Sequence, residues 1–312
     1  MISMLKRRLS LNLYYETLTL IVISTMVSNA SLAMEPTYRD IEYARLNQRS
    51  LKLDIFVPQL NDTTELNDAL ATPLVVWIHG GGWRSGDKDS VPVTHWVQQG
   101  FAIASVDYRL SPEASFPAQI HDIKAAIRFL RAHAADYHFN PQQFIVAGSS
   151  AGGHLAALVG VTSGVEELEG LVGQSLSTKS EVQAIVSFFG ASNLLSILSQ
   201  STEHGLKVRV PALQLLLGGQ PIERTDLARL ASPVTHVDAS DPPLWLCHGD
   251  ADPQMPIEQS QELWIAYQRH SIPVEFEIVQ GGKHGGDDFF QSERLERMAK
   301  ELRLMLNEKT TP

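Results

Sequence analysis

Short apolar runs, rich in β-branched residues, recur along most of the chain. They cover residues 74–78, 101–106, 144–147, 184–189, 244–247 and 274–279. Runs of this length and composition are typical of strands that are buried on both faces of a parallel sheet. Two earlier stretches, residues 40–46 and 51–57, alternate between apolar and polar positions, and they predict a pair of antiparallel strands.

The segments between the apolar runs predict helices. In residues 117–135 the apolar positions recur at spacings of three and four, as in an amphipathic helix: Ile120, Ile123, Ile127, Leu130 and Ala134. Further helices are expected over 155–159, 258–270 and 289–307. This alternation predicts an α/β three-layer sandwich, with a mostly parallel sheet, antiparallel N-terminal strands and right-handed crossovers.

Residues 34–312 are predicted to form a single domain. The polar segment 61–72 is expected to be a loop, and residues 191–240 do not follow the strand and helix rhythm. We expect this irregular stretch to form a small lid within the domain and not a second domain.

The first 33 residues have a different composition. A basic start at residues 6–8 precedes the apolar run 18–27, and small residues precede a possible cleavage point after Ala33. This pattern predicts a signal peptide over 1–33 and a secreted or periplasmic protein, with no membrane span left after processing. The apolar run is also too short to span a bilayer comfortably. A buried or interfacial N-terminal helix is the alternative.

Composition narrows the possible partners. The chain has 312 residues, of which 44% are hydrophobic, and a formal net charge of −10. An acidic surface repels phosphate backbones and anionic lipids, so neither nucleic acid nor a membrane surface is an expected partner. The single cysteine, Cys247, lies in an apolar run, so no intrachain disulfide is possible and a buried, inert thiol is expected.

Polar and glycine-rich segments follow four of the predicted strands. They are residues 79–83, 148–152, 248–253 and 280–285. Parallel sheets bind ligands at the carboxyl ends of their strands. A serine, an aspartate and a histidine are therefore expected at one edge of the sheet, in that chain order.

The motif Gly148-Ser149-Ser150-Ala151-Gly152 has the form G-x-S-x-G. It lies between a predicted strand and a predicted helix, where such a motif places its central serine on a sharp, exposed turn. The alternative is an ordinary Gly/Ser turn, but the strand and helix on either side favour a nucleophile. Ser150 is the predicted nucleophile, and Ser149 is read as a spacer.

A serine hydroxyl needs a base, and an imidazole needs a carboxylate that orients it. His284, in a glycine-rich segment, is the predicted base. Asp252 is the predicted acid, because the following proline turns the chain and can hold the carboxylate against the next loop. Asp250, which lies closer to the strand end, is the alternative acid.

The string His79-Gly80-Gly81-Gly82-Trp83 supplies backbone N–H groups that a substrate oxygen can approach closely. We predict an oxyanion hole from Gly81, Gly82 and Ala151. Trp83 is assigned to the substrate pocket, with a core position as the alternative. His121, His133, His138 and His154 show no metal-ligand spacing, and no metal or cofactor is expected.

These motifs resemble the α/β-hydrolase superfamily over roughly residues 40–305. Within it, the chain is similar to the feruloyl-esterase and carboxylesterase group, which is related to hormone-sensitive-lipase-type esterases. The resemblance is carried by residues 79–88, 106–112, 148–153 and 248–252. The resemblance implies Ser150 as the nucleophile, Asp252 as the acid, His284 as the base and the glycine loop as the oxyanion hole. The chain departs from the group at residues 190–193 and at Met255, where a Gly-Pro-Thr-Asp-like string and a valine are common.

The resulting prediction is a serine carboxylesterase that hydrolyses short-chain acyl or aryl esters through an acyl-enzyme. The substrate is expected to be a small-molecule or polysaccharide-linked ester. An amidase of the arylformamidase type and a non-catalytic binding protein on the same fold are the alternatives. The sequence does not indicate the natural ester or the oligomeric state.

Overall fold

The computed structural model describes residues 34–59 and 72–308. The predicted signal peptide, residues 1–33, and residues 61–71 of the predicted loop lie outside these ranges, so both stay predictions. Within the described ranges, none of the helices combines the length and the apolar character needed to cross a bilayer.

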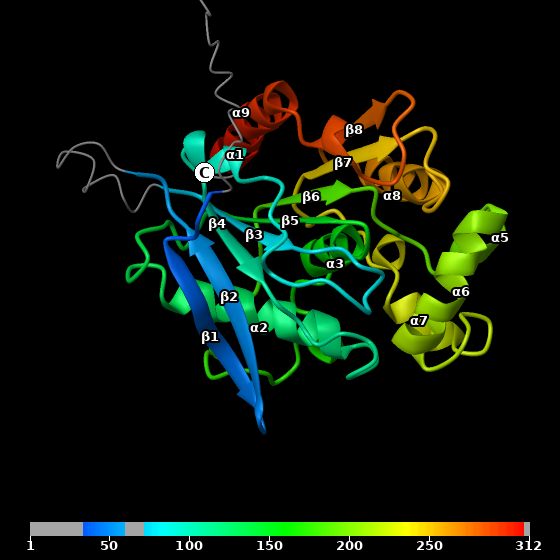
Figure 1. Ribbon diagram of the computed structural model, residues 1–312, viewed down its shortest axis with the longest axis horizontal. Helices are drawn as coiled ribbons and strands as arrows, with labels where there is room; N and C mark the ends of the chain where they lie inside the picture. The colour runs from blue at the N-terminus through cyan, green and yellow to red at the C-terminus, as the bar shows by residue number, and fades with distance from the viewer. Residues whose placement is uncertain (1–33, 60–71, 309–312) are drawn as a thin grey trace, which may run out of the picture. The chain divides into compact units, whose positions relative to one another are not determined.

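An eight-stranded sheet runs through the described part of the chain, in the order β1-β2-β4-β3-β5-β6-β7-β8 (Figure 1). Strands β1 and β2 pair antiparallel, β2 pairs antiparallel with β4, and all other neighbours are parallel. The predicted fold class is therefore confirmed. The strands are β1 Tyr38–Leu46, β2 Arg49–Phe56, β3 Leu74–Ile78, β4 Ala102–Val106, β5 Phe144–Ser149, β6 Ala184–Phe188, β7 Leu244–Gly249 and β8 Val274–Val279.

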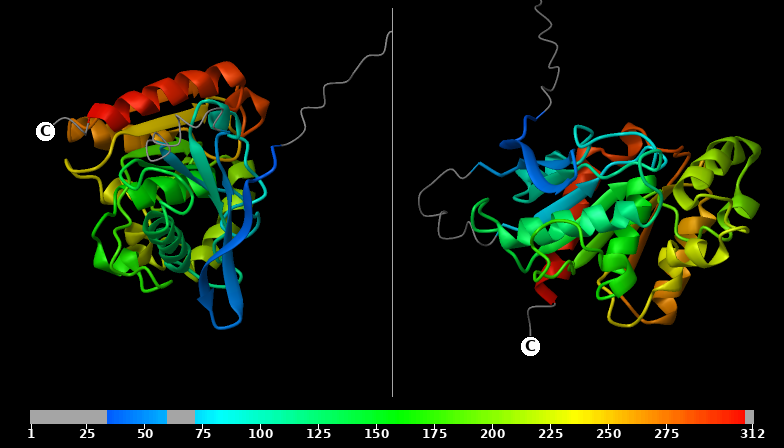
Figure 2. Two further views of the ribbon diagram at one scale, coloured as in Figure 1. Left: turned by 90° about the vertical axis from the view of Figure 1, so that its left-hand side faces the viewer. Right: turned by 90° about the horizontal axis from the view of Figure 1, so that it is seen from below.

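Helices cover both faces of the sheet. Helices α1 and α9 pack against each other on one face, and α2 and α3 contact each other on the opposite face (Figures 1 and 2). The α-helices are α1 His95–Gln98, α2 Ala118–Ala132, α3 Ala151–Gly160, α4 Glu166–Glu169, α5 Ile197–Gln200, α6 Glu203–Leu217, α7 Thr225–Leu230, α8 Glu258–Arg269 and α9 Ser292–Glu308. Two 3-10 turns, η3 Pro233–Thr235 and η4 Asp287–Phe289, complete the described elements.

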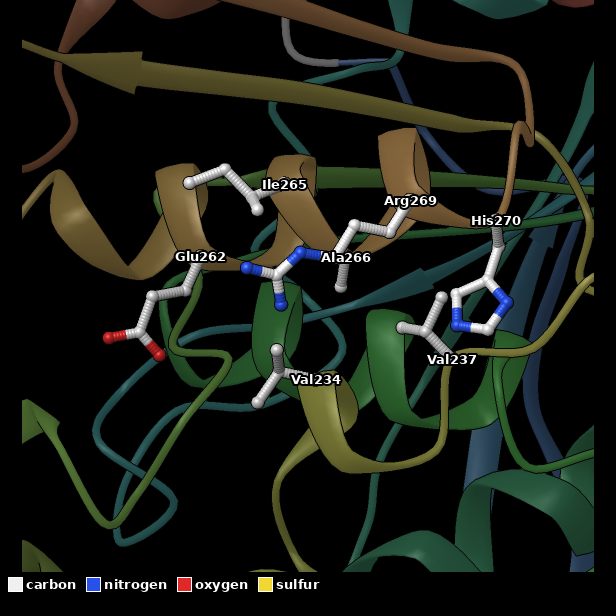
Figure 3. A pocket seen from close by; sticks show the side chains of 7 residues that line it. All are labelled: Val234, Val237, Glu262, Ile265, Ala266, Arg269 and His270. Carbon is white, nitrogen blue, oxygen red and sulfur yellow. The ribbon is translucent and has the colours of Figure 1, made fainter.

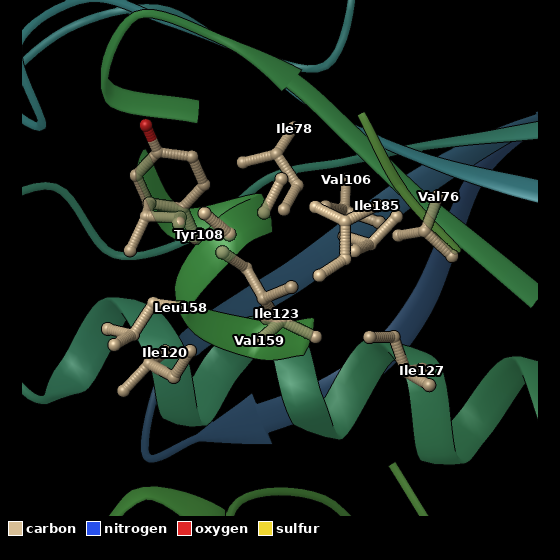
Figure 4. Packing of buried hydrophobic residues seen from close by; sticks show 14 of the residues in the cluster. Val76, Ile78, Val106, Tyr108, Ile120, Ile123, Ile127, Leu158, Val159 and Ile185 are labelled. Carbon is tan, nitrogen blue, oxygen red and sulfur yellow. The ribbon is translucent and has the colours of Figure 1, made fainter. Parts of the chain in front are cut away.

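The core lies between the central strands and the helices α2 and α3. Every residue of β3 and β4 is buried, as expected for strands covered on both faces. The apolar stripe of α2 points toward this layer, and Ile120, Ile123 and Ile127 face the side chains of the sheet (Figure 4). Burial of each such side chain contributes about 1.5–3 kcal/mol, so this packing fixes the strand ends that carry the site.

The irregular stretch 191–240 contains helices α5, α6 and α7 and the turn η3. It connects β6 with β7, and its three helices lie close together in Figure 1. Helix α6 begins at a genuine cap, because the hydroxyl of Thr202 accepts a hydrogen bond from the N–H of Gly205 at 3.0 Å. Gly218 ends it in the left-handed conformation.

A buried histidine joins three of these parts. His154, on α3, accepts a hydrogen bond at Nδ1 from the indole N–H of Trp83 (3.1 Å) and donates from Nε2 to the carbonyl of Ala231 (2.7 Å). The loop after β3, the helix α3 and the end of α7 are thereby tied together. Burial lowers the pKa of His154 to about 4, so the ring is neutral at pH 7.

Protonation of His154 is expected to weaken the fold in acid. Its folded pKa of about 4 lies below the ordinary 6.5, so the unfolded chain binds more protons between these values and stability falls as pH decreases through that window. The loss amounts to about 3 kcal/mol by pH 4. Urea unfolding of wild type and His154→Gln, measured from pH 7 to pH 4, tests this expectation.

Glutamine keeps one donor and one acceptor but does not titrate. The wild-type free energy of unfolding is therefore expected to fall more steeply than that of His154→Gln. Parallel curves for the two proteins would contradict the assignment of this pH dependence to His154.

Candidate active site

Ser150 lies at the turn between β5 and α3, in a conformation that side chains rarely adopt (φ 54°, ψ −116°). Such backbone strain costs on the order of 1–3 kcal/mol and persists only where the surroundings enforce it. Here the surroundings are backbone atoms of the neighbouring strand. A Cβ on Gly148 would lie 2.7 Å from the carbonyl oxygen of Ile78, and one on Gly152 would lie 2.6 Å from that of His79.

The structure brings Ser150, His284 and Asp252 into one hydrogen-bonded chain. Nε2 of His284 lies 2.8 Å from Oγ of Ser150, and Nδ1 lies 2.7 Å from Oδ2 of Asp252. The carboxylate of Asp252 accepts a hydrogen bond from the Nδ1–H of His284, which leaves Nε2 free to accept the serine proton. This is the geometry of an activated nucleophile.

Asp252 is held as a carboxylate. Burial alone would raise its pKa, but hydrogen bonds from His248 and His284, the charge of His284 and the backbone N–H of Met255 keep the pKa well below its usual range. The N–H groups of Gln254 and Met255 both lie 2.8 Å from Oδ1. A carboxylate in this setting stays charged at neutral pH and fixes the tautomer of His284.

His284 is neutral at neutral pH. Burial lowers its pKa below the ordinary 6.5, and the hydrogen bond and charge of Asp252 oppose this shift only in part. The ring also meets Phe189 edge to face, with 4.9 Å between the ring centroids. The imidazole is therefore positioned and in the protonation state that a general base requires.

Asp250 takes a different part in the site. It is exposed, and Oδ1 accepts a hydrogen bond of 2.6 Å from the N–H of Gly281, at the start of the segment that carries His284. Strands β7 and β8 are paired neighbours, so these two segments emerge side by side. The structure thus places Asp252, and not Asp250, against the imidazole.

A second histidine contacts the acid. His248, at the end of β7, is buried, with Nε2 3.1 Å from the carbonyl of Met255 and 3.4 Å from Oδ2 of Asp252. Its Nδ1 lies 2.7 Å from the hydroxyl of Ser260. Sequence reasoning did not single out this residue, although it stands in the same short string as Asp252.

The glycine loop passes directly beside the nucleophile. A Cβ on Gly80 would lie 3.5 Å from the Cβ of Ser150, and both Gly81 and Gly82 have positive φ (105° and 62°). Ala151 is the first residue of α3, where backbone N–H groups have no acceptor within the helix. The three residues predicted for the oxyanion hole therefore lie around Ser150.

Trp83 does not lie where we assigned it. It is fully buried, its indole N–H donates to His154, and it is not among the residues that line the cavity beside Ser150. The physical reason is that the imidazole of His154 gives the indole N–H a hydrogen-bond acceptor inside the core, so the whole ring can be buried. Its assignment to substrate binding was wrong, and the alternative core position is the one observed.

A cavity of about 670 Å³ opens at Ser150. Its wall includes the glycine loop, the segments around Ser150 and His284, helix α6 from the stretch 191–240, and the segment after Asp252. The lining residues are His79–Gly82, Arg84–Gly86, Ser90, Pro92, Ser149, Ser150, Phe189, Val208, Gln254, His284, Gly285 and Phe290.

A second hollow, of about 300 Å³, lies between α8 and η3 (Figure 3). It is lined by Val234, Val237, Glu262, Ile265, Ala266, Arg269 and His270. The carboxylate of Glu262 is engaged by Asn193, Ser196 and Gln200. This hollow contains no nucleophile paired with a base. Among the described residues, no three His, Cys, Asp or Glu side chains gather as a metal site either.

The comparisons with known proteins agree with this geometry. A family model described as BD-FAE matches residues 53–266, which include the glycine loop, Ser150 and Asp252. The chain belongs to the BD-FAE family. His284 lies beyond the matched range, and its place in the site rests on its contacts with Ser150 and Asp252.

Relatives of this BD-FAE family member are named as esterases. "Probable carboxylic ester hydrolase LipM" of Mycobacterium tuberculosis is 30% identical over 231 residues, covering 70% of this chain and 48% of that protein. The chain spans about half the length of the curated relatives that it matches.

Two solved structures match this chain over more of their own length than the curated relatives do. A truncated carbohydrate esterase from gut microbiota is 32% identical, with a TM-score of 0.77, and the match covers 88% of this chain and 99% of that one. Esterase Est2 of Thermogutta terrifontis, with propionate bound, is 26% identical, with a TM-score of 0.69 and coverages of 86% and 95%.

The tight contact at Gly152 leads to a stability prediction. Gly152→Ala is expected to lower the free energy of unfolding by more than about 3 kcal/mol, because the new methyl overlaps backbone oxygens that cannot move independently. Gly218→Ala is the matched control, since nothing lies within 4 Å of its Cβ position and only its positive φ is penalised. That control is expected to cost about 1 kcal/mol. Equal losses in thermal or urea unfolding would contradict the steric argument.

The two candidate acids can be separated by the reactivity of Ser150. Asp252→Asn is expected to slow covalent labelling by diisopropyl fluorophosphate about a thousandfold or more, because it removes the charge that fixes and stabilises the imidazole. Asp250→Asn loses one exposed hydrogen bond to Gly281, and a decrease of less than about tenfold is expected. A larger effect at Asp250 than at Asp252 would reverse the assignment.

Proposed function

We propose that this protein is a serine carboxylesterase that hydrolyses short-chain acyl or aryl esters through an acyl-enzyme intermediate. The observation that carries the proposal is the chain Ser150–His284–Asp252, which is hydrogen-bonded through both imidazole nitrogens and whose serine and histidine line a cavity. The esterase names of its relatives support the reaction class. No feature of the described residues favours the amidase or the non-catalytic alternative.

In the proposed acylation step, Oγ of Ser150 attacks the ester carbonyl carbon while Nε2 of His284 takes the hydroxyl proton. The carbonyl π electrons move to oxygen, and the N–H groups of Gly81, Gly82 and Ala151 stabilise the resulting oxyanion. When the tetrahedral intermediate collapses, the C–O bond to the leaving alkoxide breaks. His284 returns its proton to that oxygen, and the alcohol departs.

Deacylation repeats the sequence with water. His284 takes a proton from the water as its oxygen attacks the acyl carbon, and the same N–H groups bind the second oxyanion. Collapse breaks the bond to Oγ of Ser150, which recovers its proton from His284. The products are a carboxylic acid and the free enzyme.

The cavity supports a small acyl group. Its volume of about 670 Å³ is near the middle of the range for ligand pockets, and its wall combines glycines with Phe189, Val208 and Phe290. The likeness to a carbohydrate esterase supports an alcohol portion that belongs to a sugar or a polysaccharide. Export through the predicted signal peptide, residues 1–33, to the periplasm or the medium would give access to such substrates, and we include it in the proposal.

Substrate panels provide the test. The purified protein at pH 7–8 is expected to hydrolyse p-nitrophenyl acetate and butyrate faster than the laurate, since the cavity wall offers few apolar side chains to a long acyl chain. Ser150→Ala is expected to lose at least about a thousandfold of this activity. Methyl ferulate and acetylated xylan, assayed in parallel, report on the aryl-ester and sugar-ester parts of the proposal.

N-formylkynurenine serves as the amide control. Hydrolysis of this compound without any ester hydrolysis would replace the esterase proposal with an amidase. A folded protein that is inactive on every substrate, and whose Ser150 is not labelled by diisopropyl fluorophosphate, would point to a binding protein.

A further inference from the structure

A buried arginine contacts the segment after Asp252 and has no place in the mechanism above. Arg209 belongs to α6 and is 0% exposed. Its one hydrogen bond to a described residue runs from Nη2 to the carbonyl of Gln254, at 3.4 Å. Among the described residues, Nε and Nη1 have no hydrogen-bond partner.

A guanidinium in this position needs an opposite charge nearby. Burial of an unpaired charge is costly, and proteins place such groups only where another charge compensates. Asp252 is the acid whose charge attracts Arg209, and Arg84 is the cation that repels it. Burial lowers the pKa of Arg209 to about 10, so it remains a cation at neutral pH.

The same helix packs on the segment that follows Asp252. The hydroxyl of Thr202, which caps α6, donates to the carbonyl of Pro253 at 2.6 Å. A Cβ on Gly205 would lie 3.1 Å from the carbonyl oxygen of Gln254, so the helix backbone approaches this segment closely. Gln254 is thus engaged at both ends: its carbonyl accepts from Arg209, and its N–H donates to Asp252.

We propose that Arg209 is a positioning residue of the active site, which holds the segment of Asp252 through Gln254 and supplies a buried positive charge to that segment. This inference rests on the proposed function only in that Ser150 must be a nucleophile. It assigns to α6 a part in the chemistry, in addition to forming the wall of the cavity through Val208.

The sign of the electrostatic effect follows from the groups that face His284. Burial lowers its pKa, the hydrogen bond and charge of Asp252 raise it, and the electrostatic effects of Arg209 and of the His248 ring lower it. Around Arg209 itself lie Asp252, Arg84 and His154. Removal of the Arg209 charge should therefore raise the pKa of His284 and move the acid limb of the pH–rate profile upward.

Two variants separate charge from packing. Arg209→Gln removes the charge and keeps a polar side chain. Arg209→Lys keeps the charge but replaces the planar guanidinium with an ammonium group. Lys207→Gln is the matched control, because it removes an exposed positive charge two residues away on the same helix. The readout is the rate of Ser150 labelling by diisopropyl fluorophosphate from pH 4.5 to 8.5, together with kcat/KM for p-nitrophenyl acetate.

For Arg209→Gln, the acid limb is expected to move up by about half a pH unit, and the plateau rate is expected to fall about tenfold. Arg209→Lys should keep the acid limb within about 0.2 pH units of wild type, with a lowered plateau. Lys207→Gln should superimpose on wild type, because solvent screens its charge.

Three results would overturn the inference: an unmoved limb in Arg209→Gln, a limb that moves equally far in Arg209→Lys, or an equal shift in Lys207→Gln. If Arg209→Gln fails to fold, Arg209→Lys provides the test. That variant keeps the positive charge, so a shifted acid limb in it would contradict the proposed effect of the Arg209 charge on His284. Absence of labelling in wild type would instead contradict the proposed function.

Discussion

The site depends on a contact between backbone atoms that leaves no room for a side chain. The ends of β3 and β5 and the start of α3 converge where Gly148 and Gly152 face the carbonyl oxygens of Ile78 and His79. Because β3 and β5 are parallel neighbours in register, with Ile78 opposite Gly148, the glycine loop leaves the sheet next to the serine turn. The strained conformation of Ser150 is the consequence, and it is maintained by the packing of two strands and a helix.

The acid and the base reach the same point by a similar route. Strands β7 and β8 pair with Gly249 opposite Val279, so the segments that follow them start side by side. The hydrogen bond from Gly281 to Asp250 then joins the two segments before Asp252 and His284 meet. Asp252 and His284 lie 32 residues apart along the chain, yet a single hydrogen bond joins their side chains.

Much of this arrangement could be predicted from the sequence because it follows from strand ends. Short apolar runs locate the buried strands, and the chemistry-bearing residues directly follow them, so the order Ser150, Asp252, His284 was sufficient to predict their meeting. Trp83 could not be placed this way, since its position depends on His154, which lies 71 residues further along the chain. Arg209 escaped for the same reason, because its partner Gln254 lies 45 residues further along the chain. His248 is only four residues from Asp252, but a histidine at the end of a strand leaves no local pattern that shows which atoms its ring contacts.

The attachment of α6 to the segment after Asp252 bears on how such proteins can diversify. Insertions between β6 and β7 would be a convenient place to vary specificity if they only covered the cavity. Here the inserted helix contacts Pro253 and Gln254, and the latter contacts the triad acid. Replacement of the insertion by an unrelated one would therefore alter the catalytic carboxylate together with the pocket. In recombination among homologues, residues 191–240 and 250–256 should accordingly be exchanged together, because their contacts depend on one another.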